Sequence, residues 1–130
     1  MTTPLWCLLI VAALPYLSAG IGVYFRIQQL GSLDANHPRV QALELRDTAA
    51  RAYGAQANAW EAVGFFTVVV VINHLAGGDG DASATAAIVY VVARVLHALL
   101  YVADMAPART LAFIVSIGAC VRLLQLGISA

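Results

Sequence analysis

The sequence contains no lysine and few charged residues of any kind. All seven basic residues are arginines, seven acidic residues balance them, and charged residues make up only 11% of the 130-residue chain. Soluble domains average about 25% charged residues, so this low charge content argues against a soluble protein. The formal net charge is zero, and the chain therefore lacks the basic surface by which proteins bind nucleic acids.

Cysteine is also scarce. Cys7 and Cys120 are the two cysteines, and they lie in apolar runs near opposite ends of the chain. Two isolated cysteines provide neither the spacing of a metal site nor a disulfide framework, so we interpret both as small buried hydrophobic residues. The sequence also contains no glycine-rich phosphate loop, metal-ligand cluster or hydrolase triad. Its chemistry must come from other residues.

Hydrophobic residues, by contrast, make up 62% of the chain and gather in four long segments. Residues 4–25 include no charged residue across 22 positions, enough to cross about 30 Å of hydrocarbon as a helix. A signal peptide is the alternative for this segment, but MTTP lacks the basic residues of such a leader. We predict an all-α integral membrane four-helix bundle in one domain (1–130), with spans at about 4–26, 45–73, 84–104 and 108–127.

The connector after the first span is rich in Gly, Asp, Asn, His and Pro. A helix start is expected near Pro38, and the stretch VQALELRDTAARAYGAQANAW that follows has few helix breakers. We expect the second helix to begin outside the membrane, near residues 40–45, and to continue inward to about Ile72.

The arginines also predict the orientation in the membrane. Arg39, Arg46 and Arg51 follow the first span, and the last loop leads to Arg109, whereas the opposite side has no basic residue outside the helices. Cytoplasmic loops are enriched in basic residues. We therefore expect the loop at 27–50 in the cytoplasm and both termini outside, with the short loops favouring a bacterial inner membrane.

Polar residues enter the second span on one helical face. In RAYGAQANAWEAVGFF, five residues fall within about 80° of one another at about 100° per residue: Arg51, Gly54, Asn58, Glu61 and Phe65. A carboxylate such as Glu61 is costly inside a membrane unless it faces protein or water. This face is therefore a candidate functional site.

The third span repeats the pattern. In YVVARVLHALLYVAD, the residues that share one face are Tyr90, Arg94, His97, Tyr101 and Asp104. A lone arginine at the centre of a span costs about 2.5–3.5 kcal/mol. Two such helices offset this cost by facing one another or an equivalent helix in a neighbouring subunit. We expect Arg94 to pair with Glu61.

Two interpretations of these polar faces remain open. Polar side chains can serve only to hold helices together, at about 0.6–2 kcal/mol per hydrogen bond. Four arginines near one membrane face exceed that need and favour an anionic ligand carrying carboxylates. Outside this group, His74 is interpreted as a solvated loop residue. Arg122 is expected to reach the outer interface or to pair with Asp79 or Asp81.

The two motifs resemble those of the membrane-associated proteins in eicosanoid and glutathione metabolism, the MAPEG family. RAYGAQANAWEAVGFF is similar to a family pattern of Arg-Ala, then Asn-x-x-Glu and a Phe. RVLHALLYVADMAPARTL is similar to Arg-x-x-His/Tyr-x-x-x-Tyr followed by an arginine that opens the last helix. The likeness covers nearly the whole chain. It implies a homotrimer of four-helix subunits that binds glutathione between neighbouring subunits near the cytoplasmic side.

The resemblance also implies roles for individual residues. The glutathione-binding residues that it implies are Arg26, Gln56, Asn58, Glu61, Arg94, His97 and Tyr101. Arg109 matches the arginine held near the glutathione sulfur, and Thr110 beside it could donate a further hydrogen bond. A thiol has a free pKa of about 8.5 and reacts as the thiolate. A cation at a helix N-terminus favours the thiolate, and a fall of two pKa units corresponds to about 2.7 kcal/mol.

The sequence departs from the family pattern at two positions. Gly54 stands where catalytic members commonly have an arginine, and Phe113 stands where some have a tyrosine. We predict an integral membrane glutathione-binding protein, a transferase or peroxidase for lipophilic electrophiles that enter from the lipid. The alternatives are a non-catalytic scaffold of the same family and a small transporter with Glu61 as its proton site.

Overall fold

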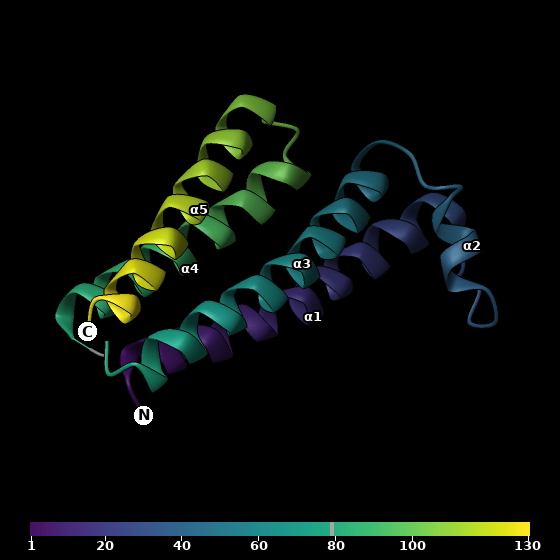
Figure 1. The fold of residues 1–130 in the computed structure, drawn as a ribbon. Helices are drawn as coiled ribbons and strands as arrows, with labels where there is room; N and C mark the ends of the chain where they lie inside the picture. Colours follow the sequence, from purple (N-terminus) through teal and green to yellow (C-terminus); the bar gives the residue numbers. More distant parts are fainter. Residues whose placement is uncertain (79) are drawn as a thin grey trace.

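The computed structural model describes residues 1–78 and 80–130, and the regular structure within them is entirely helical. Four long helices and one short helix follow in the order α1 (Thr3–Leu30), α2 (Pro38–Ala42), α3 (Asp47–Leu75), α4 (Asp81–Val102) and α5 (Ala106–Ile128) (Figure 1). Each long helix has the length and apolar composition needed to cross a membrane. The predicted all-α membrane fold is confirmed.

The connector between the first two spans differs from its prediction. Pro38 begins the separate short helix α2, and α3 begins only at Asp47. The interruption lies where the chain folds back on α1: the backbone N–H of Arg46 donates to the Gln29 side chain at 3.0 Å. Arg46 is extended and Asp47 has a φ of 49°. A single helix starting near residues 40–45 would lose this contact with the end of α1.

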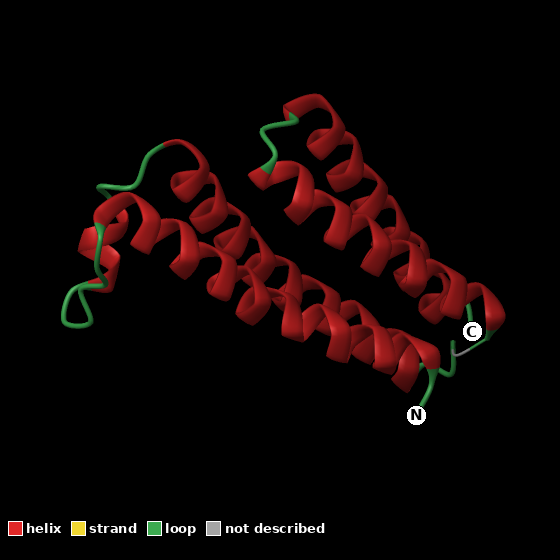
Figure 2. Ribbon diagram, turned by 180° about the vertical axis from the view of Figure 1, so that it is seen from behind, coloured by secondary structure: helices red, strands yellow, loops and turns green. Residues whose placement is uncertain are grey.

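The four long helices form two antiparallel pairs. Helix α1 lies along α3, and α4 lies along α5, as both ribbon views show (Figures 1 and 2). The pairs meet at the end that carries both termini and the turn between α3 and α4. They diverge toward the other end, where α2 and the loop between α4 and α5 lie. We call these two ends the closed end and the open end.

The core joins the two pairs. The rings of Phe66 on α3 and Tyr90 on α4 stack with centroids 4.0 Å apart, and both side chains are buried. Tyr90 also donates its hydroxyl to the Ala62 carbonyl at 3.1 Å. Cys7 and Cys120 are buried in the same core as free thiols, as predicted. Tight packing is the main attraction between helices in lipid, because lipid chains are as apolar as the side chains themselves.

One asparagine holds three helices together at the closed end. Asn73 on α3 is fully buried, and its amide donates to the Ser83 hydroxyl on α4 and to the Leu123 carbonyl on α5, each at 3.0 Å. Helix α5 approaches so closely that a Cβ added at Gly127 would lie 2.7 Å from the Asn73 Cα. The closed end is therefore tightly packed.

Candidate functional site

Arg94 is the centre of the polar cluster between the two helix pairs. Its side chain is only 5% exposed, and Nη2 donates to the carbonyl of Asn58 at 2.9 Å and to its side-chain Oδ1 at 2.6 Å. A buried guanidinium needs such partners because desolvation without hydrogen bonds is costly. Helix α4 is thereby anchored to α3 in the middle of the membrane-spanning region.

The expected pairing of Arg94 with Glu61 does not form. Asn58 stands between the two charges: its Oδ1 accepts from Arg94, and its Nδ2 donates to Glu61 Oε2 at 3.4 Å. A primary amide can do both because it carries a donor and an acceptor at opposite corners. Glu61 remains exposed, so its carboxylate is available to a ligand.

These three residues line a small cavity. Its volume is ≈190 Å³, and Phe65, Tyr90 and Phe113 supply aromatic walls. The Phe113 ring centroid lies 5.8 Å from the Arg94 guanidinium carbon and 6.0 Å from the buried His97 ring. The cavity thus combines a carboxylate, an amide and a guanidinium with an apolar wall that includes Phe113.

Gly54 and Tyr101 explain the first departure from the family pattern. A Cβ added at Gly54 would lie 2.9 Å from the Tyr101 hydroxyl oxygen, which means that the ring rests directly on α3. The Arg109 guanidinium in turn stacks over the Tyr101 ring, 4.3 Å from its centroid. A cation at this distance is attracted to the face of the ring. Arg109 therefore rests on the Tyr101 ring. A larger side chain at position 54 would displace that ring.

Thr110 is not brought to this cluster. It is exposed, and its hydroxyl donates to the Ala106 carbonyl of its own helix at 3.0 Å. His97 and Tyr101 do lie together, with ring centroids 5.8 Å apart. Of the two predicted catalytic residues, Arg109 contacts the Tyr101 ring, whereas the Thr110 hydroxyl bonds within its own helix.

Gln56 on α3 and Arg26 on α1 lie on the side of α3 opposite to the Arg94 cluster. They line a second cavity of ≈250 Å³ together with Arg39 and Tyr53. Arg26 donates from Nη1 to the Pro38 carbonyl at 3.1 Å, whereas its Nε is buried with no hydrogen-bond partner among the described residues. Five of the seven predicted ligand-binding residues thus line one of the two cavities, whereas His97 and Tyr101 line neither.

Two residues of the second cavity, Tyr53 and Arg39, are not among the predicted site residues. Tyr53 precedes Gln56 by three residues, a spacing that places both on one helical face. Arg39 was assigned only to topology, and no local pattern could bring it to the cavity because the fold of the connector does so. Both residues add hydrogen-bonding capacity beside Arg26.

Arg51 links the start of α3 to the end of α4 and to the loop that follows it. Arg51 donates from Nε to the Val102 carbonyl at 3.2 Å and lies 3.5 Å from the Asp104 carboxylate. The Asp104 side chain is 71% exposed. The predicted polar faces of α3 and α4 therefore meet along their length, from Tyr90 to Asp104.

The fold and the site together define an integral membrane protein of four long helices whose polar side chains gather between helix pairs and at one end. Residues 3–128 match the model of the MAPEG family. The chain belongs to this family, and the resemblance argued from its motifs is confirmed. Neither the curated proteins nor the solved structures include a match to the chain.

Proposed function

We propose that this protein binds glutathione between neighbouring copies of a homotrimer and transfers its thiol to lipophilic electrophiles, or reduces lipophilic peroxides with it. Membership of the family fits a membrane role related to glutathione. The observation that carries the proposal is that five of the predicted ligand-binding residues line two small cavities on opposite sides of α3. We place the open end on the cytoplasmic side of a bacterial inner membrane, in line with the distribution of the arginines.

The charges of the two cavities complement those of glutathione. This tripeptide carries two carboxylates, one ammonium group and one thiol. Arg26 and Arg39 provide guanidinium groups for carboxylates, which they can bind with two parallel hydrogen bonds each. The exposed carboxylate of Glu61 suits the ammonium group. Arg94 adds a guanidinium to the cavity of Glu61. Arg109, held on the Tyr101 ring outside both cavities, suits the sulfur as a thiolate.

The size and placement of the cavities favour a site between two copies. Their volumes, ≈190 and ≈250 Å³, are each smaller than the roughly 300–1,000 Å³ typical of small-molecule sites. Gln56 and Asn58 are two residues apart on α3, which places them about 160° apart around the helix. A compact ligand that touches both groups of residues must therefore bridge the α1–α3 side of one copy and the α4–α5 side of another.

Arg109 would activate the thiol. It lies in the first turn of α5, where the helix dipole adds positive potential. Both effects stabilise a thiolate and lower the pKa of the bound thiol from its free value of about 8.5. The thiolate sulfur then forms a bond to the electrophilic carbon, and the leaving group departs with the electron pair of the broken bond. The reaction needs no metal.

Glutathione titration of detergent-solubilised protein tests this proposal. Calorimetry reports binding, and ultraviolet absorbance reports the thiolate. We expect Glu61→Gln to weaken binding about 10-fold, whereas Glu44→Gln, a matched change at an exposed loop carboxylate, leaves it unchanged. Arg109→Ala should abolish most of the thiolate signal while retaining binding. A wild-type protein that gives neither heat nor thiolate absorbance would instead favour the non-catalytic scaffold.

A further inference from the structure

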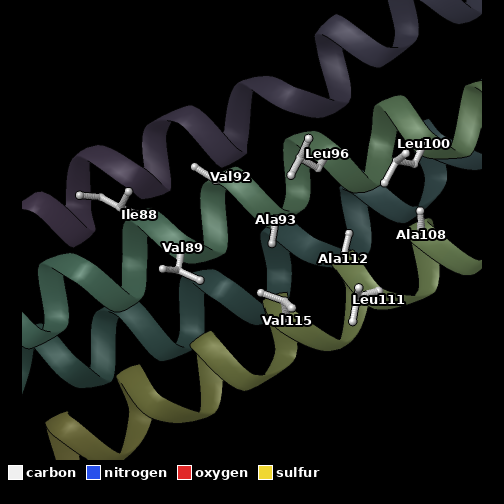
Figure 3. Close-up of a pocket in the computed structure, with 10 residues that line it drawn as sticks. All are labelled: Ile88, Val89, Val92, Ala93, Leu96, Leu100, Ala108, Leu111, Ala112 and Val115. Carbon is white, nitrogen blue, oxygen red and sulfur yellow. The ribbon is translucent and has the colours of Figure 1, made fainter.

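A long apolar groove follows the seam between α4 and α5. Its larger part has a volume of ≈460 Å³ and is lined only by apolar residues from the two helices (Figure 3). A second cavity of ≈440 Å³ continues it toward the closed end and shares Val89 and Val115 with it. The groove extends along α5 from Ala108 to Arg122, which is about 21 Å at 1.5 Å per residue.

The shape of the groove follows from the sizes of its side chains. Small residues whose side chains are buried form the floor, and they are Ala86, Ala93, Ala112 and Ala119. Larger residues that are about half exposed form the walls, and they are Ile88, Val92, Leu96 and Leu111. A row of alanines between branched side chains leaves a channel whose width suits a hydrocarbon chain.

One end of this groove is positively charged. Arg122 lines it at the closed end, where the other polar side chain is that of Thr85. Arg122 is exposed and makes no ion pair with Asp81 or any other described residue. The expected alternative partner, Asp79, lies outside the described residues. Arg122 is six residues from the end of α5, about 9 Å, so an extended side chain can reach the membrane interface.

We propose that this groove binds an anionic phospholipid, with an acyl chain along the α4–α5 seam and the phosphate at Arg122. The guanidinium can hold a phosphate with two hydrogen bonds, and a basic group beside a pocket between membrane helices is suited to a lipid head group. The groove is longer than the roughly 15 Å of one hydrocarbon leaflet, so it accommodates the chain that the head group introduces. This site is separate from the proposed glutathione site, because no residue that lines the groove also lines either of the two polar cavities.

Native mass spectrometry tests the proposal. Detergent-solubilised protein is titrated with phosphatidylglycerol or with phosphatidylcholine of identical acyl chains, and the bound lipid is counted. We expect phosphatidylglycerol to bind at least 10-fold more tightly. Arg122→Gln should lower its affinity to that of phosphatidylcholine, whereas Arg46→Gln, which removes an exposed arginine from the connector, should not. Equal binding of the two lipids by the wild type would overturn the proposal, as would an equal loss in both variants.

A substitution that fills the groove tests the position of the acyl chain. A Cβ added at Gly118 meets no atom within 4 Å, so Gly118→Leu projects into the groove without a clash at the backbone. Gly20 on α1 is equally open and exposed, and Gly20→Leu is the matched control. We expect Gly118→Leu to weaken binding of both lipids at least 5-fold and Gly20→Leu to leave it unchanged. Unchanged lipid binding in Gly118→Leu, or a change in its oligomeric state, would show that the groove has a different occupant.

Discussion

The two ends of the molecule use the same kinds of residue in opposite ways. At the closed end, Asn73 is fully buried and makes hydrogen bonds to two other helices. Nearer the open end, in the middle of the membrane-spanning region, Asn58 binds Arg94 but also lines a cavity beside the exposed Glu61. A buried amide that is bonded to two other helices acts as a structural link. An amide beside a cavity can instead exchange its partner for a ligand.

Glycine shows the same contrast. Gly127 at the closed end lets the α3 and α5 backbones approach, and its close neighbour is the Asn73 Cα. Gly54 makes room for the ring of Tyr101, which is a side chain that can rotate. The space beside the glycine is therefore limited by backbone at Gly127 and by a movable side-chain ring at Gly54.

The largest effect on stability is expected from the core between the pairs. Phe66→Ala removes a fully buried ring that stacks on Tyr90. Such truncations cost about 3–5 kcal/mol, and we expect about 3 kcal/mol because lipid lacks the hydrophobic term of water. Thermal unfolding in detergent measures the change. Phe65→Ala, at the neighbouring 48% exposed ring, is the control and should differ from wild type by less than about 0.5 kcal/mol.

A smaller effect is expected where α5 meets Asn73. In Gly127→Ala the new Cβ would lie 2.7 Å from a backbone atom, so the helices must separate, at a cost of about 1–3 kcal/mol. Gly118→Ala places its Cβ in open space on the same helix. That variant should be neutral or more stable by up to about 1 kcal/mol, because alanine is the better helix former. Equal melting temperatures for the two variants would contradict the close approach of α3 and α5.

The corresponding glycine of the open end should respond in function more than in stability. Gly54→Ala displaces the Tyr101 ring and removes the support of Arg109. The ring can rotate away, and the gain in helix propensity of up to about 1 kcal/mol offsets the disturbance. We expect a melting temperature within a few degrees of wild type but a weaker thiolate signal with bound glutathione. A stability loss as large as that of Gly127→Ala would remove the distinction between the two ends.

Helical spacing predicted which faces of α3 and α4 carry the polar residues, because a period of 3.6 residues fixes direction around an axis. It could not predict the partner of each side chain. Arg94 reaches Asn58 instead of Glu61, since side-chain length and rotamer decide which atoms meet. The opposite directions of Gln56 and Asn58 follow from the same spacing, although the family pattern assigns both to one ligand.

The connector between α1 and α3 shows what local sequence cannot provide. Helix-forming residues continue through this stretch, yet the helix is interrupted before Asp47. The backbone N–H of Arg46 there donates to the Gln29 side chain, 17 positions earlier in the sequence. A contact over that distance depends on the packed fold. For the same reason, the presence of Arg39 beside Arg26 could not be predicted from its neighbours in the sequence.

The smallest effect is expected for the ion pair at the open end. Arg51 lies 3.5 Å from an Asp104 carboxylate that is 71% exposed, and exposed pairs contribute about 0–1 kcal/mol. Asp104 also has a φ of 62°, a conformation that asparagine tolerates better than most other residues. Asp104→Asn therefore removes the charge alone and should cost less than about 0.5 kcal/mol. Asp104→Ala adds backbone strain and should cost about 1 kcal/mol or more. If thermal unfolding shows the asparagine variant to be the less stable of the two, charge rather than backbone conformation holds this loop, and the open end is more firmly fixed than its exposure indicates.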